Sequence, residues 1–160
     1  MKKILILFLL IFPMVFAVAR GGDEKQGEGE AVVAGGSDFW TENYEEAVAM
    51  SRKTGRPILA NFTGSDWCVW CIRLDKEVFS TDMFKEWAVN NVILLKLDFP
   101  NKRKISAETE KQNNALAAKY GIQGFPTILF LKADGNVLGT SGYMEGGPAS
   151  WIRNAELIIK

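Results

Sequence analysis

The sequence places two cysteines, Cys68 and Cys71, three positions apart in the segment Trp67-Cys68-Val69-Trp70-Cys71. The segment follows a short apolar run that is typical of a buried strand, and a helical pattern follows it. Two thiols at this spacing, at the start of a helix, are typical of thiol-disulfide exchange. The free N–H groups of a helix N-terminus stabilise a thiolate, so the pKa of Cys68 is expected to lie below the ~8.5 of a free cysteine. We therefore predict Cys68 as the nucleophile and Cys71, one turn further along, as the thiol that resolves a mixed disulfide on Cys68.

The cysteine pair admits three other interpretations. A tetrahedral zinc site needs four ligands, and a chain with two cysteines and no histidine could complete one only as a dimer. A permanent structural disulfide across so short a loop would remove little entropy from the unfolded chain. Gly64 and Asp66 predict a polar turn just before the cysteines, and two inert core cysteines would not need such a turn. The sequence favours a redox-active disulfide of Cys68 and Cys71, and predicts no metal and no other cofactor.

The composition excludes several other classes of function. The absence of histidine removes Ser-His and Cys-His nucleophile pairs and the side chain that most often switches charge near neutral pH. The chain has 19 basic and 19 acidic residues, and its one short basic run is 102–104, so no surface for a phosphate backbone is predicted. We expect no nucleic acid partner. A length of 160 residues is enough for one domain with its own core, and we expect a monomer.

The N-terminus carries the pattern of an export signal. A short basic start, Met1-Lys2-Lys3, precedes an almost wholly apolar run over 4–18, which is shorter than the ~20 residues that span a bilayer. The sequence Ala17-Val18-Ala19 fits a signal-peptidase site. We predict a signal peptide over 1–19 that is cleaved after Ala19; an uncleaved membrane anchor is the alternative.

A change of composition follows the predicted signal. Residues 20–37 are rich in Gly, Glu and Asp, which predicts a flexible linker, and residues 38–160 are predicted to form the folded domain. Export predicts a periplasmic location, where disulfides form and persist.

Hydrophobic periodicity predicts the elements that position the cysteines. Helical patterns cover 42–53, 71–79, 106–120 and 149–159. A further helix is predicted between the second and third of these, capped by Ser80 or Thr81 and running through Ala88. Apolar runs typical of strands cover 57–62, 92–97, 127–132 and 136–140, the last two joined by a hairpin at Asp134-Gly135. In the helix 106–120 we expect Ala115, Leu116 and Ala118 to face inward and Gly121 to cap the C-terminus. This order predicts an α/β three-layer sandwich, in which helices flank a central mixed sheet.

Two motifs resemble the thioredoxin superfamily. The first is the stretch 61–71, Asn-Phe-Thr-Gly-Ser-Asp-Trp-Cys-Val-Trp-Cys, and the second is Gly124-Phe125-Pro126-Thr127, about 55 residues further on. Over residues 38–160 the chain is similar to exported thioredoxin-like proteins of the DsbH type and to the C-terminal domain of the thiol:disulfide interchange protein DsbD. The resemblance implies a thioredoxin-like fold and thiol-disulfide oxidoreductase activity.

The resemblance also implies roles for two residues of the second motif. Pro126 would be a cis-proline that faces the cysteine pair, and Phe125 would offer backbone groups to an extended substrate peptide. Without the resemblance, Pro126 would be interpreted as an edge-strand proline, because proline cannot donate a hydrogen bond within a sheet.

One position departs from the thioredoxin pattern. Thioredoxins usually carry a buried aspartate on the strand before the cysteines, where it takes the proton of the resolving thiol, and the nearest match here is Asn61, which cannot titrate. Asp75 is a candidate substitute, because it lies four residues after Cys71 and therefore on the same helix face. The alternative for Asp75 is a solvated surface carboxylate.

Aromatic and acidic residues beside the cysteines have candidate supporting roles. Asp66 and Trp67 are predicted to shield or orient Cys68, although packing over the motif explains Trp67 equally well. Trp70 either narrows access to Cys71 or offers apolar contact area to a substrate. The other three tryptophans are expected in the core: Trp40, Trp87 and Trp151.

The residues between the cysteines bear on the direction of electron flow. Val69 and Trp70 add no positive charge that would stabilise a Cys68 thiolate, which favours a low reduction potential and hence a protein-disulfide reductase. Its expected partners are exported cysteine-containing proteins and, by family analogy, a membrane thiol electron donor of the DsbD kind. A disulfide oxidant or isomerase, and a thioredoxin-fold adaptor without enzymatic activity, are the alternatives.

Overall fold

Helices and strands alternate along the computed structural model, which describes residues 39–160; the predicted signal peptide and linker lie outside these residues. The elements are α1 (Tyr44–Thr54), β1 (Ile58–Thr63), α2 (Val69–Leu74), the π-helical turn η1 (Asp75–Phe79), α3 (Asp82–Asn91), β2 (Ile93–Asp98), α4 (Ala107–Lys119), β3 (Thr127–Leu131), β4 (Val137–Ser141) and α5 (Gly147–Ile159). Within the described part of the chain, no helix is long and apolar enough to cross a membrane.

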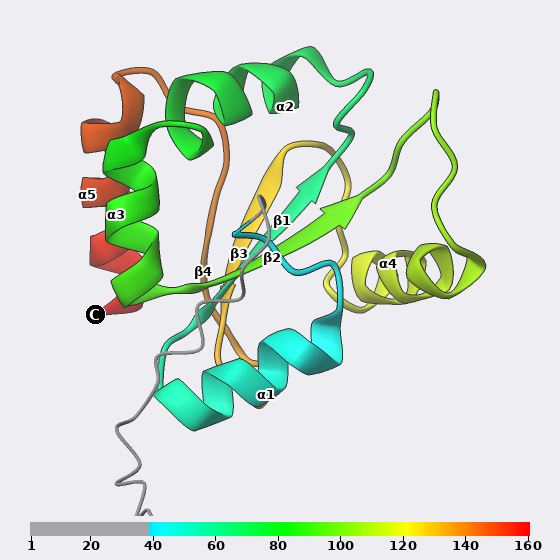
Figure 1. The fold of residues 1–160 in the computed structure, drawn as a ribbon, viewed down its shortest axis with the longest axis horizontal. Coiled ribbons are helices and arrows are strands. Elements are labelled where there is room, and N and C mark those ends of the chain that lie inside the picture. Colours follow the sequence, from blue (N-terminus) through cyan, green and yellow to red (C-terminus); the bar gives the residue numbers. More distant parts are fainter. Residues whose placement is uncertain (1–38) are drawn as a thin grey trace, which may run out of the picture. The chain divides into compact units, whose positions relative to one another are not determined.

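The four strands form one mixed sheet in the order β2-β1-β3-β4 (Figure 1). Strand β1 pairs with β2 in parallel and with β3 antiparallel, and β3 and β4 form an antiparallel hairpin. Strand β1 lies between two neighbours, and helices cover both faces of the sheet, which explains why all six residues of β1 are buried. The predicted mixed sheet and the predicted hairpin at Asp134-Gly135 are both confirmed.

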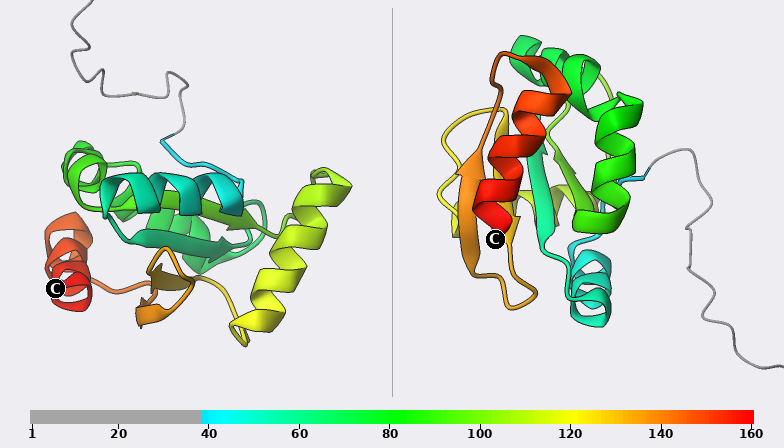
Figure 2. Two further views of the ribbon diagram at one scale, coloured as in Figure 1. Left: turned by 90° about the horizontal axis from the view of Figure 1, so that it is seen from below. Right: turned by 90° about the vertical axis from the view of Figure 1, so that its left-hand side faces the viewer.

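Each face of the sheet carries its own apolar cluster, so the fold has three layers (Figure 2). Along β1, Ala60 and Phe62 pack in the cluster that α1 and α4 cover. Leu59 packs in the cluster that α2, η1, α3 and α5 cover. The predicted three-layer α/β sandwich is therefore confirmed, with the alternation of side chains along β1 assigning each residue to one layer.

Side-chain caps fix several helix ends. The Thr81 hydroxyl accepts a hydrogen bond from the Phe84 N–H, so Thr81 rather than Ser80 caps α3. At the end of α4, the cap is Tyr120, and Gly121 lies one residue beyond it at φ 63°. The N–H groups of Gly121 and Ile122 bond back into the last turn of the helix, which is the pattern of a Schellman motif.

The inward face of α4 differs from the expected one. Leu116 is buried as predicted, but Ala115 and Ala118 are exposed, and Asn113 is buried in their place. The Asn113 side-chain amide donates a hydrogen bond to the backbone carbonyl of Asp98, and this polar contact sets the rotation of the helix. An apolar pattern alone could not reveal it.

The helix after the cysteines widens into a π turn over Asp75–Phe79, where the Ser80 N–H bonds to the Asp75 carbonyl five residues back. The wider turn places the consecutive residues Val78 and Phe79 both in the core. Ile72 is 47% exposed, because Cys71 and Leu74 occupy the buried face of α2.

Trp151 of α5 is the centre of an aromatic cluster on the α2 side of the sheet. Its ring lies 5.2 Å from Phe79 and 5.7 Å from Phe84, measured between ring centroids, and it is fully buried. The indole N–H donates a hydrogen bond to the Gly142 carbonyl. The prediction that Trp151 lies in the core is confirmed, and Trp40 and Trp87 pack half-buried against the same cluster.

We expect the substitution Trp151→Ala to lower the free energy of unfolding by about 3–5 kcal/mol, because it leaves a large cavity and an unpaired carbonyl. Urea denaturation at a fixed redox state measures the loss. Leu157→Ala is the matched control on the same helix, since Leu157 is 74% exposed, and it should change the value by less than about 0.5 kcal/mol. Equal effects of the two substitutions would contradict this description of the core.

Candidate active site

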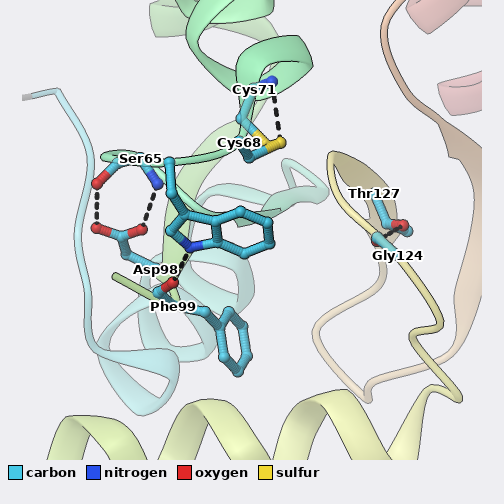
Figure 3. Close-up of a disulfide and its surroundings, with 8 residues drawn as sticks. Ser65, Cys68, Cys71, Asp98, Phe99, Gly124 and Thr127 are labelled. Carbon is cyan, nitrogen blue, oxygen red and sulfur yellow. Dashed lines mark hydrogen bonds between the residues drawn. A yellow bond between two sulfur atoms is a disulfide. The ribbon is translucent and has the colours of Figure 1, made fainter. Parts of the chain in front are cut away.

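Cys68 and Cys71 form a disulfide at the start of α2, with their Cα atoms 5.2 Å apart (Figure 3). Cys68 is the N-cap residue, and its sulfur accepts a hydrogen bond from the Cys71 N–H at 3.2 Å. Both cysteines are buried, whereas Trp67, Val69 and Trp70 around them are exposed. A sulfur that already accepts a helix N-terminal N–H is placed to be stabilised as a thiolate, which is the geometry predicted for Cys68.

The turn from β1 to α2 is a tight one over residues 64–67. The Gly64 carbonyl accepts hydrogen bonds from the N–H groups of Trp67 and Cys68. The Trp67 indole folds back over Gly64 so closely that a Cβ atom there would lie 2.5 Å from Trp67 Cε2. Only glycine leaves room for this packing, which fixes the position of the residue directly before Cys68.

Asp98, at the end of β2, ties this turn to the sheet. Its side chain is buried, and its two carboxylate oxygens accept hydrogen bonds from the Ser65 N–H at 2.9 Å and the Ser65 hydroxyl at 2.6 Å (Figure 3). The Arg103 guanidinium donates to the same carboxylate and forms an ion pair with it. These contacts compensate a buried charge, which would otherwise be costly.

Asp66 holds the loop that follows β2 rather than the sulfur of Cys68. Its carboxylate accepts hydrogen bonds from the backbone N–H groups of Asn101, Lys102 and Arg103. The bonds from these amides, that of Asn101 foremost, hold the pKa of Asp66 below its usual range. Asp66 therefore acts on the site by fastening two loops to each other.

Trp67 joins the same loop to the second motif. Its indole N–H donates a hydrogen bond to the Phe99 carbonyl at 2.7 Å, and its ring meets the Phe125 ring edge-on at 6.0 Å. The Phe99 and Phe125 rings stack at 4.9 Å. Because Trp67 directly precedes Cys68, these contacts bring the turn with Phe125 next to the disulfide. The peptide bond between Phe125 and Pro126 is cis, and the Thr127 hydroxyl donates a hydrogen bond to the Gly124 carbonyl across the turn (Figure 3).

Trp70 makes another aromatic contact of the site, with Tyr143 from the segment before α5. The two rings are 5.1 Å apart, and the Arg73 guanidinium lies over both. Glu77 accepts hydrogen bonds from Arg73 and Tyr143, and the bond from Arg73 is the main reason why the pKa of Glu77 is lowered. Trp70 still exposes 52% of its surface, so it offers apolar contact area beside the disulfide.

The two candidates for the missing aspartate lie in different surroundings. Asp75 is exposed and accepts a hydrogen bond from the Ser80 hydroxyl, which is the setting of a solvated carboxylate. Asn61 is buried on β1, and its side-chain oxygen has no hydrogen-bond partner. Among residues 39–160 no cluster of three or more metal-binding side chains is present.

Residues 44–152 match the family model of the thioredoxin-like domain. The chain belongs to this family. It is 32% identical over 152 residues to the disulfide bond reductase DsbH of Chlamydia pneumoniae, which covers 95% of this chain and 90% of that protein. A solved structure of a DsbH oxidoreductase matches with a TM-score of 0.73 at 31% identity, over 88% of this chain and 95% of that one. The thiol:disulfide interchange protein DsbD of Yersinia pestis is 29% identical over 87 residues, which are 54% of this chain and 13% of that longer protein.

The family and the cysteine pair together identify the chain as a thioredoxin-like thiol-disulfide oxidoreductase. The predicted family resemblance is confirmed over the folded domain. Three residues that the sequence did not single out also build the site: Asp98, Phe99 and Tyr143. Asp98 had a detectable signal, an acidic residue at the end of a strongly apolar strand run, whereas nothing local marks Phe99 or Tyr143.

We expect Asp66→Ala to speed amide hydrogen exchange at residues 101–103, because the three N–H groups lose their acceptor. The pKa of Asp66 is lowered in the folded state, so its contribution is present above the usual carboxyl pKa and is lost as the pH falls through the lower, folded-state value. The difference between variant and parent should therefore disappear in acid. NMR-detected exchange measures both effects, and Asp75→Ala, an exposed carboxylate bonded to Ser80, is the control. Unchanged exchange at these amides in Asp66→Ala would refute the fastening role.

Proposed function

We propose that the protein is an exported reductase that reduces disulfide bonds of other exported proteins through Cys68 and Cys71. The observation that carries the proposal is the disulfide at the N-terminus of α2, where the Cys68 sulfur is the cap and Cys71 lies one turn behind it. The relative that this chain matches over most of both lengths is named a disulfide bond reductase, which supports the same direction.

The reaction needs only the two cysteines and a client disulfide. In the dithiol form, the Cys68 thiolate attacks one sulfur of the client disulfide, a mixed disulfide forms, and the other client sulfur leaves as a thiolate. The Cys71 thiolate then attacks the Cys68 sulfur and releases the second client thiol. The client gains two electrons and two protons, and the Cys68–Cys71 disulfide forms. No cofactor beyond this disulfide is part of the proposal.

The direction is argued from the charges around Cys68. In the described part of the chain the Cys68 sulfur accepts a hydrogen bond from the Cys71 N–H, and neither Val69 nor Trp70 adds a positive charge. The Arg73 guanidinium lies over the Trp70 ring and is paired with the Glu77 carboxylate. Modest stabilisation of the thiolate corresponds to a low reduction potential, which suits a reductase rather than a disulfide oxidant or isomerase.

The periplasm is the proposed location, because residues 1–19 have the pattern of a cleaved signal peptide. The proposed clients are exported proteins with cysteine pairs, contacted through the exposed rings of Trp70 and Trp67 and through the turn at Phe125 and Pro126. In an oxidising compartment the pair must be reduced again after each cycle. A membrane thiol donor of the DsbD kind is proposed for that step, and the protein is proposed to act as a monomer.

The substitution Cys71→Ser should trap clients. The Cys68 thiolate can still form the mixed disulfide, but no thiol remains to resolve it, so covalent adducts accumulate. Non-reducing electrophoresis after mixing with a disulfide-containing client such as insulin detects them. Cys68→Ser is the matched control and should give few adducts; if it traps more than Cys71→Ser, the two roles are reversed.

The reduction potential of the Cys68–Cys71 pair should lie below about −230 mV. Equilibration in glutathione buffers, with free thiols counted at each ratio, measures it. A value above about −180 mV would instead support an oxidant or isomerase. A cysteine pair whose free thiols do not change with the glutathione ratio, together with client binding by the double Cys→Ser variant, would support a thioredoxin-fold adaptor without enzymatic activity.

A further inference from the structure

Two buried side-chain polar atoms in residues 39–160 have no hydrogen-bond partner: Asn61 Oδ1 and Trp87 Nε1. Asn61 is only 8% exposed, and it lies in the middle of the central strand β1. A buried amide oxygen without a donor costs stability, so such atoms are rare and require an explanation. The position of Asn61 relative to the disulfide supplies one.

Asn61 shares a face of β1 with Leu59, because side chains alternate along a strand. Leu59 belongs to the same apolar cluster as Leu74 of α2. The chain turns after β1 within residues 64–67, and α2 runs from that turn across the end of the sheet (Figure 1). One step back from Leu74 on the buried helix face is Cys71, about 4.5 Å along the helix. One step on from Leu59 is Asn61, about 6.6 Å along the strand. Asn61 therefore lies on the sheet face that α2 covers with Cys71 and Leu74, toward the end of β1 that leads into the disulfide.

The oxidation state of Cys71 decides whether the Asn61 oxygen can find a donor. In the disulfide the sulfur carries no hydrogen, so it has nothing to donate to Oδ1. Reduction breaks the S–S bond with two electrons and two protons from a dithiol donor, which itself becomes a disulfide. The buried Cys71 then carries an S–H group. A buried thiol has little access to water, so a nearby carbonyl oxygen is its natural acceptor.

We propose that Asn61 is a positioning residue, whose side-chain oxygen accepts a hydrogen bond from the Cys71 thiol in the reduced protein and so favours the dithiol form. The inference rests on the proposed redox cycle of the pair, but not on its direction. Lys96 of β2 and Ile128 of β3 are the register partners of Asn61 on this face. Lys96 is half-buried, and its side chain carries the charge nearest to Asn61 in the sheet register. Ile128 is apolar, so it can neither donate a hydrogen bond to Asn61 Oδ1 nor accept one in its place.

The test is the thiol-disulfide equilibrium of Asn61→Leu, a side chain of similar shape without an acceptor. The disulfide no longer faces an unpaired oxygen and the thiol has lost its partner, so the equilibrium should shift about fivefold toward the disulfide. For a two-electron couple this lowers the reduction potential by about 20 mV. Asn61→Asp keeps an oxygen in place and should hold the potential at or above the parent value. A mere packing role would weaken both redox forms alike and leave the potential unmoved.

Ile128→Val is the matched control, because it loosens the same face without removing a hydrogen-bonding atom. A shift of less than twofold in Asn61→Leu, or an equal shift in Ile128→Val, would overturn the inference. If Asn61→Leu does not fold, the infrared S–H stretch of Cys68→Ser, whose sole thiol is Cys71, gives an independent readout. The band should lie at the lower frequency of a hydrogen-bonded thiol, and a free-thiol frequency would refute the proposal. Failure of the parent pair to be reduced at all would instead refute the proposed function.

Discussion

The buried carboxylate of Asp98 is the constraint on which the rest of the site depends. It ends the strand beside β1 and holds Ser65 by both its N–H and its hydroxyl, while Arg103 neutralises its charge. The turn over 64–67 is therefore held to the sheet, and with it the start of α2 at Cys68. A rigid turn matters to thiol exchange, because attack on a disulfide needs the nucleophilic sulfur held in one orientation.

Two aromatic contacts frame this fixed disulfide. Trp67 meets Phe125 of the turn that contains the cis peptide bond, and Trp70 meets Tyr143 of the segment before α5. Each contact joins the cysteine segment to a part of the chain far away in sequence, and each leaves a tryptophan half-exposed. Rings that are held in place and still exposed give apolar contact area at a small cost in conformational entropy.

The local sequence was sufficient for the elements and for the reacting atoms. Helix and strand patterns depend on neighbouring residues. The capping of α2 by Cys68 is also local, because only four residues separate Cys68 from the end of β1. Prediction failed where a distant polar contact intervened. Ala115 and Ala118 were expected to face inward, but the bond from Asn113 to the Asp98 carbonyl rotates α4. The π turn that buries both Val78 and Phe79 likewise has no local pattern that would announce it.

The sequence by itself determined the chemistry, because two thiols three apart after a buried strand and the absence of histidine leave little other than disulfide exchange. It also determined the family, through the two motifs around Cys68 and Pro126. Only the tertiary structure decided what the surrounding residues do. Asp66 holds a loop rather than a sulfur, Asp75 lies in solvent, and Asn61 is buried with an unpaired oxygen. Such roles depend on which atoms the folded chain brings within hydrogen-bond distance, and spacing along the sequence does not contain that information.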